Sequence, residues 1–227
     1  MGRAAEGRGA VGERGKRHGK PFALRENPHP SAGVPYRPSV PVPRCPAVFL
    51  DRDGTIIEDP GFLHDPDRVR LLLGAAAAVG RLNRAGFLVV VASNQSGVAC
   101  GLYPISACHA VEERLNALLA REGARIDAHY LCPHHPDYTG PCECRKPGVR
   151  LFREAAERFD IDLARSWWVG DRLRDVQPAS AFGGRGLLVL TGAGATEAEL
   201  TEARAVTVVQ DVGAAAEVIV NQVNSKQ

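Results

Sequence analysis

At 227 residues, with 44% hydrophobic and 24% charged residues, the chain has the size and composition of one globular domain with a sizeable core. Its net charge of +2 gives no reason to expect a nucleic-acid partner, and no apolar run approaches the roughly 20 residues that a membrane-spanning helix needs. The N-terminus carries arginines and glycines but no apolar stretch of the secretory-signal type. We therefore expect a cytoplasmic protein that binds neither nucleic acid nor membrane.

Residues 1–44 differ in composition from the rest of the chain. They are rich in glycine, arginine and proline and show little apolar periodicity. This composition predicts a disordered basic extension, since it offers too little apolar surface for a packed core. A basic arm that binds a polyanion is the alternative. The folded domain is expected to span residues 45–227.

From residue 45 onward, short apolar runs alternate with helical patterns. Strands are expected at 47–50, 87–92, 126–131, 167–169, 186–190 and 206–209, and helices at about 74–85, 104–121, 148–159, 173–182, 196–204 and 211–221. The strands lack alternating polarity, which is typical of strands buried on both faces. The pattern predicts an α/β domain with a doubly wound, Rossmann-like parallel sheet and helices on both faces.

Two aspartates, Asp51 and Asp53, directly follow the first expected strand. Alternate side chains of a strand point to the same side, so both carboxylates can face one site. Gly54 allows a sharp turn just beyond them. Such a pair suits a divalent cation and a covalent reaction step, whereas the plainer interpretation is a strand that ends in a polar turn.

Polar clusters also follow the next three strands, which favours the interpretation as a site. Ligands of open α/β sheets bind at the carboxyl ends of the strands, where these clusters would converge. Asp51, Asp53 and Asp171 offer oxygen ligands for Mg²⁺. Donors for a phosphoryl group come from Ser93, Asn94, Arg145 and Lys146. A cation, a nucleophilic carboxylate and phosphate donors predict phosphoryl transfer, with water as the acceptor because no ATP-binding motif is present.

A compact loop at 132–144 contains three cysteines and two histidines. Cys132, His134, Cys142 and Cys144 are the simplest ligand set for a closed tetrahedral Zn²⁺ site, with His135 in reserve. A disulfide is the alternative, but it leaves one of the three thiols unpaired. Arg145 and Lys146 follow the last cysteine directly, so a structural zinc ion would fix where these cations point.

Four separated motifs, DRDGT, SNQSG, RKP and GDRLRD, occur in an order that resembles the haloacid dehalogenase superfamily of phosphohydrolases. The resemblance covers about residues 47–192. It implies that Asp51 attacks phosphorus and forms an aspartyl-phosphate, and that Asp53 is the general acid and base. It implies Mg²⁺ bound by Asp51, the backbone carbonyl of Asp53 and Asp171, with Asp175 as an outer partner. Ser93 and Lys146 would hold the phosphoryl oxygens.

Within that superfamily, the stretches CPHHP, CECRKP and DRDGTIIEDPGFLHDPD look like the D-glycero-D-manno-heptose-1,7-bisphosphate 7-phosphatases. The resemblance implies a sugar phosphate substrate whose C7 phosphate is removed, with Arg145 at the phosphate that is kept. Phe62 could instead be a core residue. The substrate-binding set implied is Asp51, Arg52, Asp53, Asp59, Pro60, Gly61, Phe62, Ser93, Asn94, Gln95, Ser96, Arg145, Lys146 and Arg172.

Two alternatives remain open from the sequence. A histidinol-phosphate phosphatase shares the DxDGT start and a similar zinc loop, although the NQSG and CPHHP stretches favour the heptose group. The other alternative is a sugar-phosphate-binding protein without catalytic activity. The intact Asp51, Asp53 and Asp171 argue against it, since such a protein would be free to lose its nucleophile. Cys100 stands where many relatives have arginine, so one anion contact of the group is in doubt. Because no large cap insert separates the motifs, we expect a minimal cap, an open site and a monomer.

Overall fold

The computed structural model describes residues 44–225. The extension predicted at residues 1–44 therefore lies outside the described residues, apart from Arg44. Within the described part of the chain, no helix combines the length and the hydrophobicity needed to cross a membrane.

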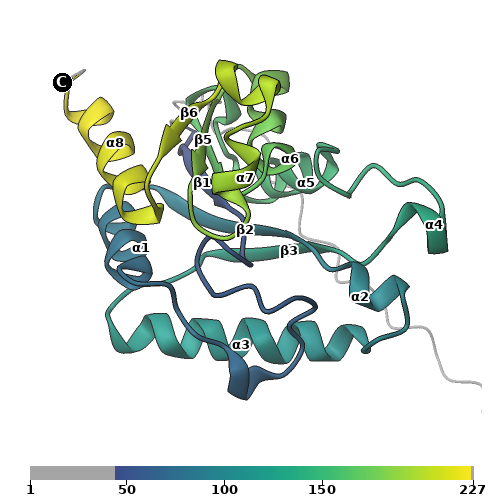
Figure 1. Ribbon diagram of the computed structural model, residues 1–227. Coiled ribbons are helices and arrows are strands. Elements are labelled where there is room, and N and C mark those ends of the chain that lie inside the picture. The colour runs from purple at the N-terminus through teal and green to yellow at the C-terminus, as the bar shows by residue number, and fades with distance from the viewer. Residues whose placement is uncertain (1–43, 226–227) are drawn as a thin grey trace, which may run out of the picture. The chain divides into compact units, whose positions relative to one another are not determined.

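A single six-stranded parallel sheet forms the centre of the described domain (Figure 1). Its order is β3-β2-β1-β4-β5-β6. The first strand is therefore central, the next two strands extend the sheet on one side of it, and the last three extend it on the other side. The strands are β1 (Ala47–Leu50), β2 (Leu88–Asn94), β3 (Ala128–Cys132), β4 (Trp167–Gly170), β5 (Arg185–Val189) and β6 (Thr207–Val209). The predicted doubly wound sheet is confirmed. The crossover between β1 and β4 is the place where such folds bind ligands.

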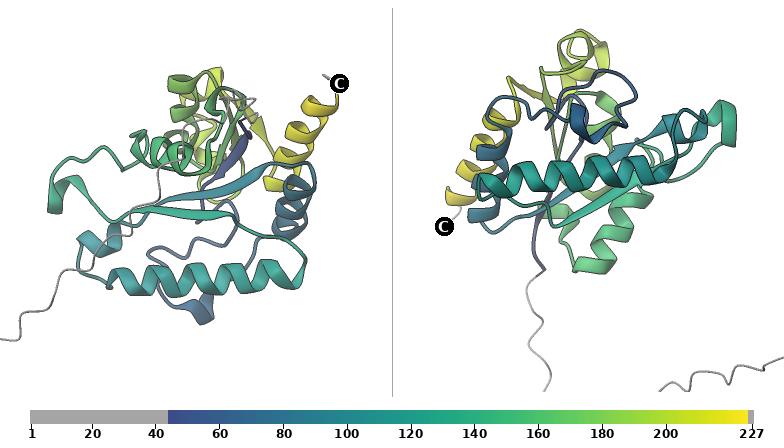
Figure 2. Two further views of the ribbon diagram at one scale, coloured as in Figure 1. Left: turned by 180° about the vertical axis from the view of Figure 1, so that it is seen from behind. Right: turned by 90° about the horizontal axis from the view of Figure 1, so that it is seen from below.

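Helices cover both faces of the sheet because the central strands are apolar on both sides. Val48 and Leu50 of β1 point into a core closed by α1 (Ala75–Arg84), α3 (Ile105–Arg121) and α8 (Val212–Asn224). Ala47 and Phe49 point the other way, into a core closed by α5 (Arg150–Phe159). Helices α1 and α8 lie side by side (Figure 1), and α3 runs along one side of the sheet in both views of Figure 2.

Two predicted helices are each divided into two shorter ones. The helix expected at 173–182 is α6 (Leu173–Val176) followed by a 3₁₀ helix, Gln177–Phe182, and that at 196–204 is α7 (Gly194–Glu197) followed by a 3₁₀ helix, Thr201–Ala205. Pro178 lies in the first turn of Gln177–Phe182, where its missing N–H leaves no helical bond unmade. Four further short helices were not predicted: α2 (Ser96–Ala99), α4 (Pro136–Thr139) and two 3₁₀ helices, Pro66–Arg68 and Leu163–Arg165.

Candidate active site

A cleft of about 480 Å³ opens at the carboxyl ends of β1, β2 and β4. It receives side chains from the loop after β1, from the end of β2, from the loop at residues 132–144, hereafter the zinc loop, and from α6. The residues that were expected from the sequence and that line this cleft are Asp51, Asp53, Asp59, Gly61, Phe62, Ser93, Asn94, Gln95, Ser96, Arg145, Arg172 and Asp175. The sheet topology therefore brings polar clusters together from segments that are more than 100 residues apart.

Lys146 joins two buried carboxylates below the cleft. Its Nζ lies 2.6 Å from Asp51 Oδ1 and 2.8 Å from Asp175 Oδ1, and it also donates to the carbonyl oxygen of Ala92. All three charged side chains are almost fully buried. Burial alone would lower the pKa of Lys146, but Asp175 and Asp51 outweigh it and raise that pKa above its ordinary value. Lys146 is therefore a permanent cation that fixes the position of Asp51.

Asp171 completes an acidic cluster with Asp51 and Asp175, whose ligand atoms lie within 4.8 Å of one another. Its Oδ2 accepts a hydrogen bond from the backbone N–H of Ala193, while its Oδ1 is buried without a partner among the described residues. Burial, followed by the charge of Asp51, raises the pKa of Asp171 to about 7. A buried carboxylate oxygen without a protein partner is available to an ion or to a water molecule.

The charge of this cluster matches a divalent cation. Three carboxylates and one ammonium group sum to −2 when all are ionised, and oxygen donors suit Mg²⁺. Gly54 and Gly192 both approach the Asp171 carboxylate closely, and a Cβ at either position would overlap Asp171 Oδ2. The residues present therefore fit a magnesium ion, held through Asp51 and Asp171.

Asp53 turns away from the acidic cluster towards a second set of partners. Arg52 binds it through both Nε and Nη2, with the closest contact at 2.9 Å, and Gln95 Nε2 donates to its Oδ2 at 2.9 Å. Burial raises the pKa of Asp53, and the charge of Arg52 opposes this effect without cancelling it. A raised pKa favours the protonated carboxyl group that a general acid needs.

A hydrogen-bonded chain behind Asp53 fixes its orientation. Gln95 Nε2 also donates to Ser93 Oγ at 2.8 Å, and the Tyr103 hydroxyl donates to Gln95 Oε1 at 3.2 Å. Tyr103 packs directly on Gly97, where any Cβ would overlap the phenol ring. Tyr103 was not predicted as a site residue, because nothing in its local sequence shows that it reaches back to Gln95.

Backbone and side-chain bonds hold the two cations of the RKP motif. Asn94 makes two hydrogen bonds to the backbone of Lys146, one donated at 3.2 Å and one accepted at 3.0 Å. Arg145 Nη1 donates to Ser96 Oγ at 2.7 Å and to the carbonyl oxygen of His134 at 3.2 Å. The loop that contains His134 therefore helps to set the direction of the Arg145 guanidinium.

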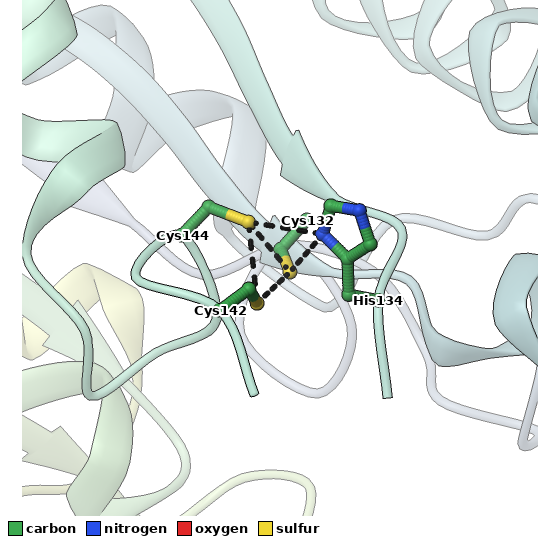
Figure 3. Close-up of side chains that lie close together, drawn as sticks. All are labelled: Cys132, His134, Cys142 and Cys144. Carbon is green, nitrogen blue, oxygen red and sulfur yellow. Dashed lines mark hydrogen bonds between the residues drawn. The ribbon is translucent and has the colours of Figure 1, made fainter. Parts of the chain in front are cut away.

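Cys132, His134, Cys142 and Cys144 point toward one another (Figure 3). The three sulfur–sulfur separations are 3.1, 3.4 and 3.6 Å, which are too long for disulfide bonds. His134 Nδ1 lies 3.2 Å from Cys144 Sγ and 3.8 Å from Cys132 Sγ. Zinc–sulfur bonds of about 2.3 Å place ligand atoms of a tetrahedron at comparable separations. Four such ligands fit a structural zinc ion, while His135 instead accepts a bond from the backbone N–H of Asp137.

Several sequence expectations need correction. The Asp53 carboxylate is not part of the acidic cluster, because Arg52 and Gln95 hold it elsewhere, while the expected contact of magnesium with the backbone carbonyl of Asp53 stays a prediction. Arg52 is 1% exposed and does not line the cleft; its side chain supports Asp53, and its expected contact with a substrate stays a prediction. Pro60 also does not line the cleft. Phe62 is 53% exposed at the cleft, so the alternative of a core residue is wrong.

Other residues line the cleft without having been predicted: Leu63, Tyr103, His135, Asp137, Tyr138 and Arg174. Cys100, noted from the sequence only for standing in place of arginine, lines it as well. Most of them come from the zinc loop and from α6, beside motifs that the sequence does mark. The GDRLRD motif contains Arg174, but the alternation of arginine and leucine there does not show which side chains reach the cleft.

Comparisons with known proteins agree with this geometry. A family model described as HAD-hydrolase-like matches residues 143–215. The D-glycero-beta-D-manno-heptose-1,7-bisphosphate 7-phosphatase of Bordetella bronchiseptica is 42% identical over 148 residues, which are 65% of this chain and 82% of that protein. The D-glycero-D-manno-heptose-1,7-bisphosphate 7-phosphatase of Thermosynechococcus vestitus is 44% identical over 158 residues, which are 66% of this chain and 81% of that protein.

A solved structure extends the agreement to the fold. The crystal structure of D,D-heptose 1.7-bisphosphate phosphatase from B. bronchiseptica, complexed with magnesium and phosphate, has a TM-score of 0.71 and 38% sequence identity to this chain. The match covers 78% of this chain and 99% of that one. The chain therefore belongs to the haloacid dehalogenase-like phosphatases, and within them to the same family as these heptose-bisphosphate phosphatases.

Proposed function

We propose that this protein hydrolyses the C7 phosphate of D-glycero-D-manno-heptose 1,7-bisphosphate, as the names of its relatives indicate for them. The observation that carries the proposal is the pairing of Asp51 with Lys146 at 2.6 Å, next to a cleft that Asp51 and Asp53 both line. A fixed nucleophile and a separately held proton donor are the two groups that phosphate ester cleavage through a covalent intermediate needs.

In the first half-reaction, an Asp51 carboxylate oxygen attacks the C7 phosphorus. The bond from phosphorus to the sugar oxygen breaks, and Asp53 donates its proton to that oxygen as the sugar leaves. Lys146 and Ser93 hold the phosphoryl oxygens by charge and hydrogen bonding. The raised pKa of Asp53 supports this assignment, because it favours the protonated form of the carboxyl group.

In the second half-reaction, Asp53 accepts a proton from a water molecule while that water attacks the phosphorus of the aspartyl-phosphate. The bond between phosphorus and the Asp51 oxygen breaks, which releases inorganic phosphate and restores the carboxylate. Arg52 and Gln95 keep the Asp53 carboxyl group aimed at the cleft in both steps. Magnesium, held by Asp51 and Asp171, would supply charge neutralisation between the anionic nucleophile and the anionic phosphate.

The zinc loop has a supporting role in this proposal. The ion would be structural, because all four of its positions are taken by Cys132, His134, Cys142 and Cys144. Its effect on the reaction runs through Arg145, whose guanidinium bonds to the His134 carbonyl. We further propose a cytoplasmic monomer with a basic extension at residues 1–44.

A phosphate-release assay tests the function directly. The panel contains both anomers of the heptose bisphosphate, histidinol phosphate and p-nitrophenyl phosphate, each with the wild type and with Asp51→Asn. We expect release of one phosphate per heptose bisphosphate, from C7, and none with Asp51→Asn. A preference for histidinol phosphate would show that the substrate is histidinol phosphate and not the heptose bisphosphate. Release of phosphate from none of the sugar phosphates would favour a sugar-phosphate-binding protein without catalytic activity.

A further inference from the structure

The loop at residues 59–64, which follows β1, contacts the segment just before α3 through one histidine. Its members that line the cleft are Asp59, Gly61, Phe62 and Leu63. His64 comes next, and its ring stacks on the ring of Tyr103, with the two centroids 5.0 Å apart and an angle of 15° between the planes. His64 is exposed whereas Tyr103 is buried, so the histidine covers the phenol ring from the solvent side.

His64 also holds the backbone of this loop. Its Nδ1 lies 2.9 Å from the carbonyl oxygen of Phe62, and since a carbonyl only accepts, Nδ1 donates this hydrogen bond. Phe62 has a φ of +48°, in the left-handed region that bulky residues rarely adopt. Such a conformation persists where surrounding contacts impose it. One ring therefore fixes the turn at Phe62 and packs on Tyr103.

Tyr103 passes this constraint to Gln95. The Tyr103 hydroxyl donates to Gln95 Oε1 at 3.2 Å, and burial raises the pKa of Tyr103 to about 12, so the hydroxyl keeps its proton at neutral pH. An amide whose oxygen is bound in this way presents its NH₂ group to the other side. Nε2 there donates to Asp53 Oδ2 at 2.9 Å and to Ser93 Oγ at 2.8 Å. The hydroxyl thus selects the amide orientation in which Gln95 binds Asp53.

We propose that His64 is a positioning residue, which acts through Tyr103 and Gln95 to keep the Asp53 carboxyl group oriented for proton transfer. A substrate that contacts the loop at Asp59 and Phe62 then stabilises the same arrangement that orients Asp53, because a coupling between two sites is reciprocal. The inference rests on the proposed function, since it takes Asp53 as the general acid and base. His64 belongs to the stretch DRDGTIIEDPGFLHDPD, but the sequence alone assigns it no role.

A double-mutant cycle in the kinetics with the heptose bisphosphate tests this route. Tyr103→Phe removes only the hydroxyl, and it should lower kcat roughly 3- to 10-fold with KM within about twofold. His64→Ala should lower kcat by a similar factor and also raise KM, because the loop loses its anchor. His64→Phe keeps a ring that stacks on Tyr103 but cannot donate to the Phe62 carbonyl, so it should recover kcat and leave KM raised.

Two matched variants are the controls. His109→Ala removes an exposed histidine on α3, and Tyr130→Phe removes the hydroxyl of a tyrosine on β3. Both should match the wild type in kcat and KM. Zinc content should be unchanged in all of these variants, because none of them alters a residue of the cysteine and histidine cluster.

The double variant His64→Ala/Tyr103→Phe decides whether the two residues act in one chain. Its kcat should equal that of Tyr103→Phe alone, because both changes break the same route to Asp53, while its raised KM should match that of His64→Ala. A kcat reduced by the product of the two single losses would overturn the inference. Equal loss of kcat in His64→Phe and His64→Ala would overturn it too, and so would an unchanged kcat in Tyr103→Phe.

These outcomes are distinct from failure of the proposed function. If the wild type prefers another phosphate ester, the substrate assignment fails and the same cycle is measured with that ester. If the wild type releases phosphate from no ester, the proposed function and this inference fail together. An active wild type with multiplying losses overturns the inference alone.

Discussion

Replacing Lys146 by methionine should reveal how strongly the acidic cluster depends on one buried cation. Lys146 is 3% exposed and contacts two carboxylates at 2.6 and 2.8 Å. With an effective dielectric constant of ~20, each pair is worth ~6 kcal/mol before desolvation is subtracted. Removing one partner of a buried pair leaves the carboxylates uncompensated, and such changes typically reduce the free energy of unfolding by ~3–5 kcal/mol. We expect a loss of this size at pH 8 without metal.

The loss should depend on pH with a definite sign. In Lys146→Met, the carboxylates of Asp51, Asp171 and Asp175 repel one another unless they are protonated. Protonation becomes easier as pH falls, so the difference in unfolding free energy between wild type and variant should shrink between pH 8 and pH 5. Mg²⁺ should recover part of the loss at pH 8, because it neutralises the same carboxylates.

Urea denaturation followed by circular dichroism at pH 8 and pH 5, with and without Mg²⁺, measures these differences. Arg121→Met on the exposed face of α3 is the control for removal of a cation, and it should change stability by less than ~0.5 kcal/mol. An equal loss for Lys146→Met at both pH values, or no loss at pH 8, would refute the reasoning from uncompensated charge.

Three further predictions concern the zinc loop, the support of Asp53 and the metal site. Cys142→Ser should lose zinc and most of the activity, whereas the control Cys45→Ser should keep both. Mass spectrometry measures the zinc content and a phosphate-release assay measures the activity. A zinc-free variant with normal turnover would contradict the role of the loop. Gly97→Ala should lower kcat about tenfold or more and leave the zinc content intact, because the new methyl group displaces Tyr103 from Gln95, which holds Asp53. An unchanged kcat would show that Asp53 does not depend on Tyr103. The pKa of Asp171 is raised from 3.8 to about 7, so the metal-free protein should lose stability as pH rises from about 4 to 7. Thermal unfolding should show that saturating Mg²⁺ removes this loss. A stability of the metal-free protein that does not depend on pH in this range would contradict the prediction.

The sheet was predictable because its strands are continuous apolar runs buried on both faces. Every strand lies within two residues of its predicted bounds at each end. The short helices α2 and α4 could not be predicted, since four residues complete barely one turn and give no periodic pattern. The helix expected at 173–182 is divided near Pro178. The apolar periodicity continues across this proline, so the periodicity alone predicted one uninterrupted helix.

The sequence was sufficient to predict which polar clusters come together in the site, because parallel strands bring their carboxyl ends to one edge of the sheet. The direction of each side chain was not. Asp53 turns to Arg52 and Gln95 instead of the acidic cluster, and this depends on a hydrogen-bonded chain that ends at Tyr103. Arg174 could not be distinguished from a solvent-facing arginine, since only the packing of α6 against β4 and β5 places it in the cleft.

The zinc cluster also has a consequence for folding. Within residues 44–225, strand β3 lies at the edge of the sheet and pairs only with β2. Its last residue, Cys132, lies opposite Asn94, and the Cys132 carbonyl oxygen accepts a hydrogen bond from the backbone N–H of Gln95. Metal binding at Cys132 therefore stabilises the register of an edge strand as well as the loop beyond it. Zinc depletion would weaken the hold on this edge strand, and an edge that frays can pair with other chains, so metal supply bears on solubility as well as on turnover.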